Sequence, residues 1–258
     1  MKANYHTHTH RCRHAAGTET EYIQAAVDSG FQVLGFADHA PWPFASGYVS
    51  RIRMTPDQLP DYLTTLKALK AQYRDQITLR IGLECEYFTP YMDYLKFMRE
   101  QVDYLLLGMH WLHSEESNPY TPDLCQTDDG IKQYADELCR AMASGLYAYV
   151  AHPDLFMRRR QEWNKTCQQA TEQIVRTAGE YHLPVEYNLN GEKLFRRGEH
   201  FFPCREFWAQ AAQYGVPAIL GADAHQPELL ANTALWNESR DYLTGLGFTV
   251  TPCLPLDA

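Results

Sequence analysis

Several features that would place this chain in a common class are missing from its 258 residues. No apolar run approaches the roughly 18–20 residues that span a membrane, and the N-terminal segment lacks the apolar stretch of a signal peptide. The seven cysteines are odd in number, widely spaced and without a C-x-x-C pair. We therefore expect no membrane partner, no disulfide framework and no thiolate zinc site, and a cytoplasmic location by default.

Nucleotide-binding and linker motifs are absent as well. No G-x-G-x-x-G follows an early strand and no P-loop is present, which disfavours nucleotide-binding α/β folds. No repeat, low-complexity tract or linker divides the chain, and 45% hydrophobic residues suffice for one core, so residues 1–258 are expected to form a single domain. A net charge of −9 without a basic aromatic stripe argues against a nucleic-acid partner.

Short apolar runs alternate with longer amphipathic stretches along the chain. Hydrophobic periodicity predicts strands in seven of these runs. They are Ala3–Thr7, Val33–Ala37, Thr78–Leu83, Tyr104–Met109, Tyr147–Ala151, Pro184–Asn188 and Pro217–Gly221, and a last run at Gly247–Cys253 is a candidate extra strand. Alternation with helices predicts parallel strands joined by crossover connections, in a barrel or a doubly wound sheet.

Helices are expected between the strands, and several have clear end signals. Thr18 with Glu21 forms a capping-box pattern, and Pro56 stands in the first turn of another helix. Further helices are expected at Asp128–Ser144, Lys165–Tyr181 and Arg205–Tyr214, and Gly30, Gly145 and Gly215 are typical helix stops.

Potential metal ligands follow six of the seven predicted strands. They occur in His6-Thr7-His8, Asp38-His39, Gly82-Leu83-Glu84, Gly108-Met109-His110, Ala151-His152 and Asp223-Ala224-His225. In a parallel barrel, sites are built at this end of the strands, and like charges gathered there without a cation would be costly.

The spacing of these residues favours shared metal ions. Residues i and i+2 of a strand point to the same face, so His6 and His8 can hold one ion together, and Asp223 and His225 repeat the spacing. Imidazole and carboxylate ligands suit zinc, manganese or iron. Mixed sites of this kind often keep a position open for water.

The same motifs, in this order, resemble the polymerase-and-histidinol-phosphatase (PHP) family. The first motifs of the family resemble four segments near the start of the chain: His6-Thr7-His8-Thr9, Cys12-Arg13-His14, Gly17-Thr18 and Glu21-Tyr22. Its later motifs resemble the segments from Ala37-Asp38-His39 to Gly221-Ala222-Asp223-Ala224-His225. The resemblance spans residues 4 to 226, and within the family it is strongest to monofunctional histidinol-phosphate phosphatases of histidine biosynthesis.

The resemblance implies a single-domain, distorted (β/α)7 TIM-like barrel with three divalent metal ions, whose identity stays open between zinc, manganese and iron. By position, His6, His8, Glu84 and Asp223 would hold the first ion. Glu84 would bridge to a second ion, also held by His110 and His152, and His14, His39 and His225 would hold the third. Glu86 is a rival to Glu84, which is preferred for its Gly-x-Glu arrangement.

The resemblance also implies hydrolysis of L-histidinol phosphate to L-histidinol and phosphate by a metal-activated water. The alternative keeps the chemistry on another small phosphate ester, such as a nucleotide or sugar phosphate. Closely spaced divalent ions can acidify a water and clamp phosphoryl oxygens, and the leaving alkoxide needs a proton. Asp223, His225 and Glu84 are the predicted catalytic residues, with the general acid left open between Asp223 and a site histidine.

Substrate contacts are expected from loops that follow the strands. A phosphate ester calls for arginine donors, and the clusters Arg158-Arg159-Arg160 and Arg196-Arg197 provide them. From the resemblance we expect one arginine of each loop, Arg160 and Arg197, to bind phosphate. Glu115 is a candidate partner for the substrate amine, and His113 lies close enough in sequence to the His110 motif to contact substrate.

Overall fold

Seven parallel strands pair in sequence order in the computed structural model, which describes residues 2–256. The strands are β1 (Ala3–Asn4), β2 (Val33–His39), β3 (Thr78–Cys85), β4 (Tyr104–Leu107), β5 (Tyr149–Val150), β6 (Val185–Asn188) and β7 (Ala218–Gly221). A doubly wound sheet would reverse its strand order at a switch point. The uninterrupted order β1 to β7 therefore excludes that alternative.

The last strand returns to the first and nearly closes the sheet. Thr7 forms a parallel bridge with Ala224, in which the His8 amide donates to the Ala224 carbonyl at 3.0 Å. The Asn4 side chain accepts a hydrogen bond from the Ala222 amide at 2.8 Å. The result confirms the predicted distorted (β/α)7 barrel.

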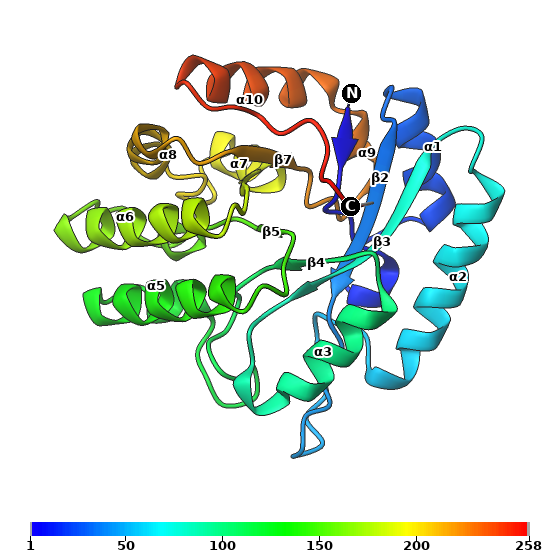
Figure 1. Ribbon diagram of the computed structural model, residues 1–258, viewed down its shortest axis with the longest axis horizontal. Helices are drawn as coiled ribbons and strands as arrows, with labels where there is room; N and C mark the ends of the chain where they lie inside the picture. The colour runs from blue at the N-terminus through cyan, green and yellow to red at the C-terminus, as the bar shows by residue number, and fades with distance from the viewer. Residues whose placement is uncertain (1, 257–258) are drawn as a thin grey trace.

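Helices cover the outside of the strands (Figure 1). They are α1 (Glu19–Asp28), α2 (Leu59–Gln72), α3 (Met92–Gln101), α4 (Thr121–Leu124), α5 (Asp128–Ala143), α6 (Lys165–Glu180), α7 (Leu189–Arg196), α8 (Arg205–Ala211), α9 (Pro227–Ala231) and α10 (Thr233–Gly245). Helix α5 packs against α6, α6 against α8, and α1 against α9. The strands are thereby buried on both faces, as parallel sheets require.

The core has an inner and an outer layer because side chains alternate along each strand. In β2, Val33 and Ala37 face the barrel interior, where Tyr104 and Tyr149 also lie. Phe36 of the same strand points outward into the larger cluster beneath the helices. The barrel centre is a packed core with the strand ends above it.

The predicted helix signals are confirmed at several ends. Thr18 and Glu21 form the capping box, with the Glu21 carboxylate accepting from the Thr18 amide at 2.6 Å. Gly30, Gly145 and Gly215 follow helices with φ between 67° and 75°, a left-handed conformation in which glycine carries no steric penalty.

The predicted extra strand at Gly247–Cys253 is wrong. This segment makes one isolated parallel bridge, between Val250 and Ala218, and Pro252 then removes the next backbone donor. The Ala218 amide donates to the Thr249 carbonyl at 3.0 Å, and the Thr251 amide donates to the Ala218 carbonyl at 2.7 Å. The segment thus pairs with β7 only at the amino end of that strand. Leu254 then enters the inner core cluster, and its amide donates to the Tyr5 hydroxyl at 3.1 Å.

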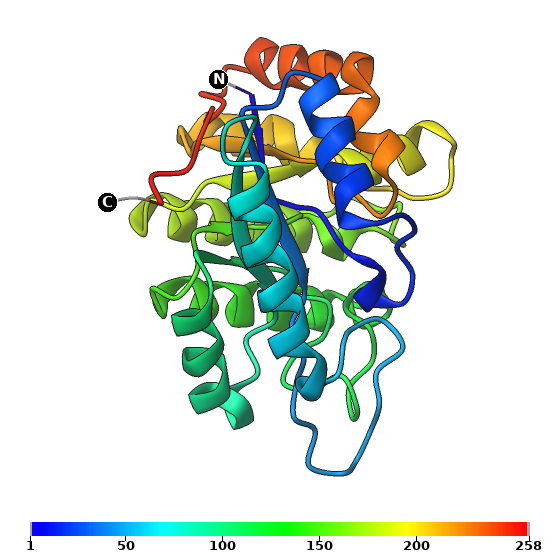
Figure 2. The same ribbon diagram turned by 90° about the vertical axis from the view of Figure 1, so that its right-hand side faces the viewer.

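One long connection, from the end of β2 to the start of α2, projects from an end of the barrel in Figure 1 and Figure 2. It follows the carboxyl end of β2, so it lies on the side where the strand-end ligands are expected. Across residues 2–256, every helix is too short or too polar to span a bilayer.

Candidate metal centre

The residues predicted as metal ligands lie together at the carboxyl ends of the strands. The rings of His8 and His225 are 4.1 Å apart between centroids, those of His8 and His39 are 4.4 Å apart, and those of His14 and His225 are 4.4 Å apart. On the other side of the cluster, the rings of His110 and His152 are separated by 5.0 Å. Segments from His6 to His225 thus converge on one face of the barrel.

Glu84 lies at the centre of this cluster and is 1% exposed. One oxygen, Oε2, lies 2.9 Å from His39 Nδ1 and 3.4 Å from His6 Nε2. The other, Oε1, lies 2.8 Å from His152 Nε2 and 3.4 Å from His110 Nε2. A carboxylate with a different set of imidazoles at each oxygen has the arrangement of a bridging ligand, as predicted for Glu84.

The outer nitrogens of several rings are held by acceptors around the cluster. His14 Nδ1 donates to the Cys12 carbonyl at 2.7 Å, and His225 Nδ1 donates to the Asp223 carbonyl at 3.0 Å. His6 Nδ1 lies 2.8 Å from the carboxylate of Glu186. Because these acceptors require a proton on Nδ1, each ring presents a bare Nε2 lone pair on its other side.

Several buried atoms of the cluster make no hydrogen bond of good geometry. Among the described residues, they are His6 Nε2, His8 Nε2, His39 Nδ1, Glu84 Oε2 and His225 Nε2, together with His152 Nδ1 on the side of its ring away from the Glu84 contact. Unsatisfied buried polar atoms are rare and destabilising. Their concentration at one place, with nitrogen and oxygen donors only 4.8 Å or less apart within several triads, fits the requirements of divalent cations.

Charges within the cluster favour added positive charge. Burial acts to raise the pKa of Glu84, but His110, His6 and other histidines hold it well below its usual range. Burial acts to lower the pKa of His8, yet bonds and charge from Asp223 and other acids raise it to about 9. Burial and the charge of His8 lower the pKa of His225 to about 3. The carboxylates stay ionised, and the histidines cannot all be protonated because their positive charges repel. Divalent cations would supply the missing positive charge without a proton on every ring.

Two residues of β6, Glu186 and Asn188, support the cluster and were not predicted. Glu186 is fully buried against His6, and Asn188 donates to Glu186 at 2.8 Å and to Asp223 at 3.1 Å. The sequence carried a signal, because Glu186 and Asn188 have the same i, i+2 spacing as His6 and His8, which follow β1.

Glycines leave the space that the two central carboxylates occupy. A Cβ atom at Gly108 would lie 2.2 Å from Glu84 Oε1, and one at Gly221 would lie 2.2 Å from Glu186 Oε2. Any other residue at these positions would displace a carboxylate. The Gly-x-His and Gly-x-Asp patterns at the strand ends therefore have a steric cause.

Asp223 and His152 adopt backbone conformations that are unusual for their residue types. Their φ angles are 48° and 30°, in the region that costs of order 1–3 kcal/mol for a residue other than glycine. Such strain clusters at functional sites, where surrounding contacts maintain it. In this chain it turns both side chains toward the cluster.

A cavity of about 520 Å³ opens directly above the cluster. It is lined by His14, His39, Ile52, His110, Trp111, Tyr120, Arg158, Arg159, Asn190, Asp223 and His225. Its volume falls within the range of small-molecule sites. Of the three predicted catalytic residues, Asp223 and His225 line it and Glu84 lies buried beneath.

Comparison with known proteins agrees with this geometry. Residues 4–190 match the family described as the PHP domain. The chain belongs to the PHP family. The match ends before β7, so the positions of Asp223 and His225 rest on the motif order and on the geometry above.

Relatives of this PHP protein include several proteins named as phosphatases. A protein of Deinococcus radiodurans named probable histidinol-phosphatase is 31% identical over 231 residues, covering 86% of this chain and 85% of that protein. The histidinol-phosphatase of Bacillus subtilis is 24% identical, covering 88% of this chain and 94% of that protein. A Lactococcus lactis histidinol phosphate phosphatase structure, complexed with zinc, L-histidinol and phosphate, shares the fold with a TM-score of 0.75 at 15% identity, covering 96% of this chain and 95% of that one.

The arginines predicted to bind phosphate do not reach the cavity of this PHP protein. Arg160 is buried, and its guanidinium donates to the Gln126 carbonyl at 2.8 Å and to Asp128 at 2.9 Å. Arg197 lies at the end of α7 with a side chain that is 60% exposed. Arg196 is paired with Glu192 and Glu238, so neither arginine of the second cluster is among the described residues that line the cavity. The predicted phosphate contacts of Arg160 and Arg197 are not supported by this arrangement.

Arg158 and Arg159 are the arginines that line the cavity. Arg158 donates to the Tyr120 hydroxyl at 2.6 Å and lies 3.1 Å from His200 Nε2. Its Nε atom is buried without a hydrogen-bond partner. Arg159 is paired with Asp123 through one of its terminal nitrogens, so both guanidinium groups keep donors at the cavity.

Glu115 and His113 are likewise not among the residues that line the cavity. Glu115 accepts hydrogen bonds from Arg53 at 2.7 Å and from Ser50 at 2.7 Å, which engages both of its oxygens. His113 lies 3.3 Å from Glu137. Neither arrangement supports the predicted contact with substrate.

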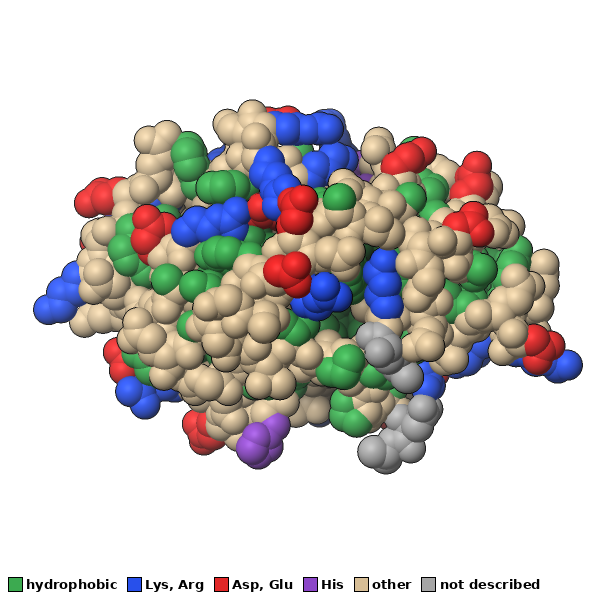
Figure 3. Space-filling view, turned by 90° about the horizontal axis from the view of Figure 1, so that it is seen from above, with side chains coloured by type: hydrophobic (Ala, Val, Ile, Leu, Met, Phe, Trp, Pro, Cys, Tyr) green, Lys and Arg blue, Asp and Glu red, His purple; other side chains and the backbone are tan. Residues whose placement is uncertain are grey.

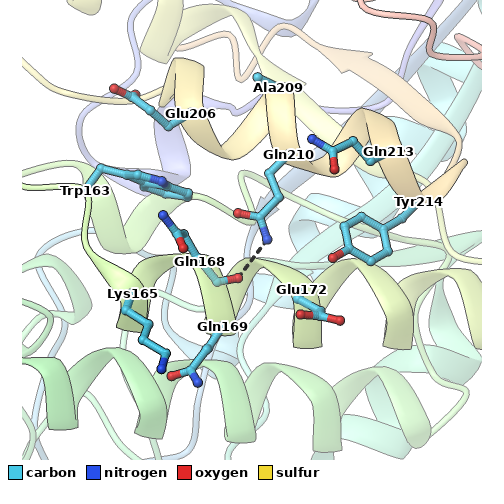
Figure 4. A pocket seen from close by; sticks show the side chains of 10 residues that line it. All are labelled: Trp163, Lys165, Gln168, Gln169, Glu172, Glu206, Ala209, Gln210, Gln213 and Tyr214. Carbon is cyan, nitrogen blue, oxygen red and sulfur yellow. Dashed lines mark hydrogen bonds between the residues drawn. The ribbon is translucent and has the colours of Figure 1, made fainter.

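A second depression, of about 630 Å³, lies between α6 and α8 (Figure 4). Four of its ten lining residues are glutamines, with Trp163 and Tyr214 at its sides, and Gln210 donates to the Gln168 carbonyl at 2.8 Å. Glu172 and Glu206 are the only potential metal ligands among the described residues that line it. The chemistry is therefore concentrated at the strand ends.

On the face seen in Figure 3, basic and acidic side chains are interspersed. A surface that binds a nucleic-acid backbone gathers its Lys and Arg side chains along one stripe. This face does not have that distribution.

Proposed function

We propose that this PHP protein is a metal-dependent phosphomonoesterase that hydrolyses L-histidinol phosphate to L-histidinol and phosphate. The observation that carries the proposal is the cluster of unsatisfied buried ligand atoms beneath a cavity with a free arginine donor. The names of the relatives supply the substrate. Such an activity would act in histidine biosynthesis.

We propose that three divalent ions, zinc, manganese or iron, are held by the cluster. The residues are His6, His8, His14, His39, Glu84, His110, His152, Asp223 and His225. Ions in such a site lower the pKa of a bound water and neutralise charge on phosphoryl oxygens. The assignment of each residue to one ion stays a prediction.

Asp223 is placed to move protons in this reaction. It lines the cavity, and Asn188 holds its Oδ2 at 3.1 Å. Burial acts to raise the pKa of Asp223, but His6 and His225 hold it well below its usual range. Ionised Asp223 can take a proton from the attacking water and pass it to the leaving alkoxide as the ester P–O bond breaks. Its place in the cavity lining supports this role, and the general acid stays open between Asp223 and a site histidine.

Arg158 would bind a phosphoryl oxygen of the substrate through its guanidinium, because this side chain lines the cavity above the cluster. Trp111 and Tyr120 form one wall of the cavity, with ring centroids 5.3 Å apart. Such a wall suits the planar imidazole of histidinol. The phosphate and the heterocycle would then lie beside each other in one cavity, because Arg158 donates to the Tyr120 hydroxyl.

A test compares phosphate release from several esters by protein loaded with zinc or manganese. We expect kcat/KM for histidinol phosphate to exceed the values for glycerol phosphate, glucose phosphate and a nucleoside monophosphate by at least about 100-fold, the effect of roughly 2.7 kcal/mol of differential transition-state binding. Equal values for all four would rule out a dedicated histidinol-phosphate phosphatase.

One observation favours the second candidate, a phosphatase for another small ester such as a sugar or nucleotide phosphate. Among the described residues that line the cavity, Asp223 is the only carboxylate, and the predicted partner for an amine, Glu115, is engaged elsewhere. A substrate without an amine would need no further acid. The same panel of esters distinguishes the two candidates.

We further propose that residues 1–258 form one domain and that the protein acts in the cytoplasm, with a small phosphate ester as its partner. The family match at residues 4–190 and the pairing of β7 with β6 in the same sheet support the first proposal. Fractionation of cells followed by detection of the protein tests the second.

A further inference from the structure

Beside the cluster lies a buried ion network that the proposed reaction does not use. Its centre is Arg53, which is 1% exposed although it belongs to the long connection after β2. Its guanidinium donates to Glu86 Oε1 at 2.8 Å, to Glu86 Oε2 at 3.0 Å and to Glu115 Oε2 at 2.7 Å. A further bond goes to the Ala40 carbonyl at 3.0 Å.

This network contains more carboxylates than are needed to balance its positive charge. One guanidinium faces two buried carboxylates, and the desolvation of three charged groups is costly. A well-packed apolar cluster of the same volume would often be equally stable. The network therefore needs a reason beyond stability.

Glu86 connects this network to the metal cluster. Glu86 Oε1 lies 3.1 Å from His110 Nδ1, and the Trp42 indole donates to Glu86 Oε2 at 2.9 Å. On its other side, His110 Nε2 lies 3.4 Å from Glu84 Oε1. His110 thus stands between a carboxylate that Arg53 fixes and the carboxylate at the centre of the cluster.

We propose that Glu86, held by Arg53, is a positioning residue that fixes the tautomer and orientation of His110 for metal binding. The inference rests on the proposed metal centre. An ionised carboxylate can only accept, so His110 Nδ1 carries the proton, and Nε2, which lies 3.4 Å from Glu84 Oε1, is the nitrogen left to bind metal. Arg53 prevents Glu86 from turning into the cluster and becoming a ligand itself, which explains why Glu84 rather than Glu86 occupies the centre.

The hydrogen bonds of Glu86 define a sharp substitution. Arg53, Trp42 and His110 direct four donated bonds at its two oxygens. In Glu86→Gln, an amide nitrogen replaces one carboxylate oxygen and cannot accept a hydrogen bond. The donors that pointed at that oxygen therefore lose their acceptor, and the His110 proton is no longer fixed on Nδ1. Glu115→Gln is the matched control, because the hydrogen bonds of Glu115 in the described structure come from Arg53, Ser50 and Tyr48 and not from His110.

The first measurement needs no variant. Long-range ¹H–¹⁵N spectra of metal-free wild-type protein, assigned with a His110→Gln sample, report which ring nitrogen of His110 carries the proton. We expect the Nδ1–H tautomer. An Nε2–H tautomer would overturn the proposal whether or not the protein binds metal, which separates this outcome from failure of the proposed function.

The second measurement is zinc affinity, by competition with a chromophoric chelator. Loss of such a supporting carboxylate weakens metal binding by about 10–100-fold, and we expect this for Glu86→Gln. Glu115→Gln should stay within about threefold of the wild type. Wild-type affinity in Glu86→Gln, or an equal loss in both variants, would show that the network acts only on the loop and would overturn the proposal.

Discussion

Replacement of Arg158 tests the site where structure and sequence disagree most. Arg158→Met keeps the length of the side chain and removes its charge and donors. The structure gives this guanidinium one buried N–H without a partner, at the wall of the cavity. We expect the variant to lose a charge-assisted bond to the phosphoryl group.

The size of the effect follows from one such bond. A hydrogen bond to a charged group contributes about 1.5–3 kcal/mol, and each 1.36 kcal/mol is tenfold in rate. The expected loss in kcat/KM is therefore about 10–150-fold. The bond from Arg158 to the Tyr120 hydroxyl at 2.6 Å is lost as well, so the Tyr120→Phe variant is needed to measure that part separately.

The assay is steady-state phosphate release from histidinol phosphate, with inhibition by inorganic phosphate as a second readout. Arg160→Met and Arg197→Met serve as controls. Arg160 makes bonds only to protein groups in the described structure, so its loss should lower the free energy of unfolding by about 1–3 kcal/mol and leave KM unchanged. Arg197 is 60% exposed and its loss should change little. A larger kinetic loss for either control than for Arg158→Met would refute the placement of the arginines.

Three further predictions address the cluster and the helix beside it. Asp223→Asn should lower kcat by about 10²–10⁴-fold, the usual contribution of a proton-transfer group; an unchanged kcat would exclude that role. Treatment with a chelator should lower the melting temperature by about 5–10 °C, the effect of losing a ligand present at roughly 100 times its Kd, and added zinc should restore it; a melting curve insensitive to both would argue against a metal centre. Burial acts to raise the pKa of Glu192, but bonds from Arg196, Tyr187 and other donors lower it. Because a depressed acid stabilises the fold above its unfolded pKa, Glu192→Gln should cost about 1–3 kcal/mol near pH 7. The difference between variant and wild type should shrink in urea titrations as the pH falls below about 4, and a constant difference would point to packing instead.

Strand-end ligands could be read from the sequence because their positions follow local rules. The H-x-H spacing of His6 and His8 has meaning on any strand, since side chains repeat every two residues. The glycine before Glu84, Gly82, leaves room for the Tyr104 ring, and the one before His110, Gly108, leaves room for the Glu84 carboxylate. The order of the motifs then identified the family and its barrel.

Loop contacts could not be read in the same way. Whether Arg158 or Arg160 faces the cavity depends on the short 3-10 helix at Leu155–Met157 and on the partners that capture each guanidinium. Those partners, Tyr120 and Asp128, come from other segments of the chain.

The sequence by itself determined an α/β fold with parallel strands and the ligands at six strand ends, because periodicity and the convergence of parallel strands are general properties of such folds. The order of its motifs, through the family resemblance, added the barrel and His14. Only the tertiary structure decided which arginine lines the cavity and that Glu186 supports His6. It also decided that Arg53 binds Glu86 and so leaves the centre to Glu84. These choices depend on contacts between residues that are distant in the chain, and no local pattern encodes such contacts.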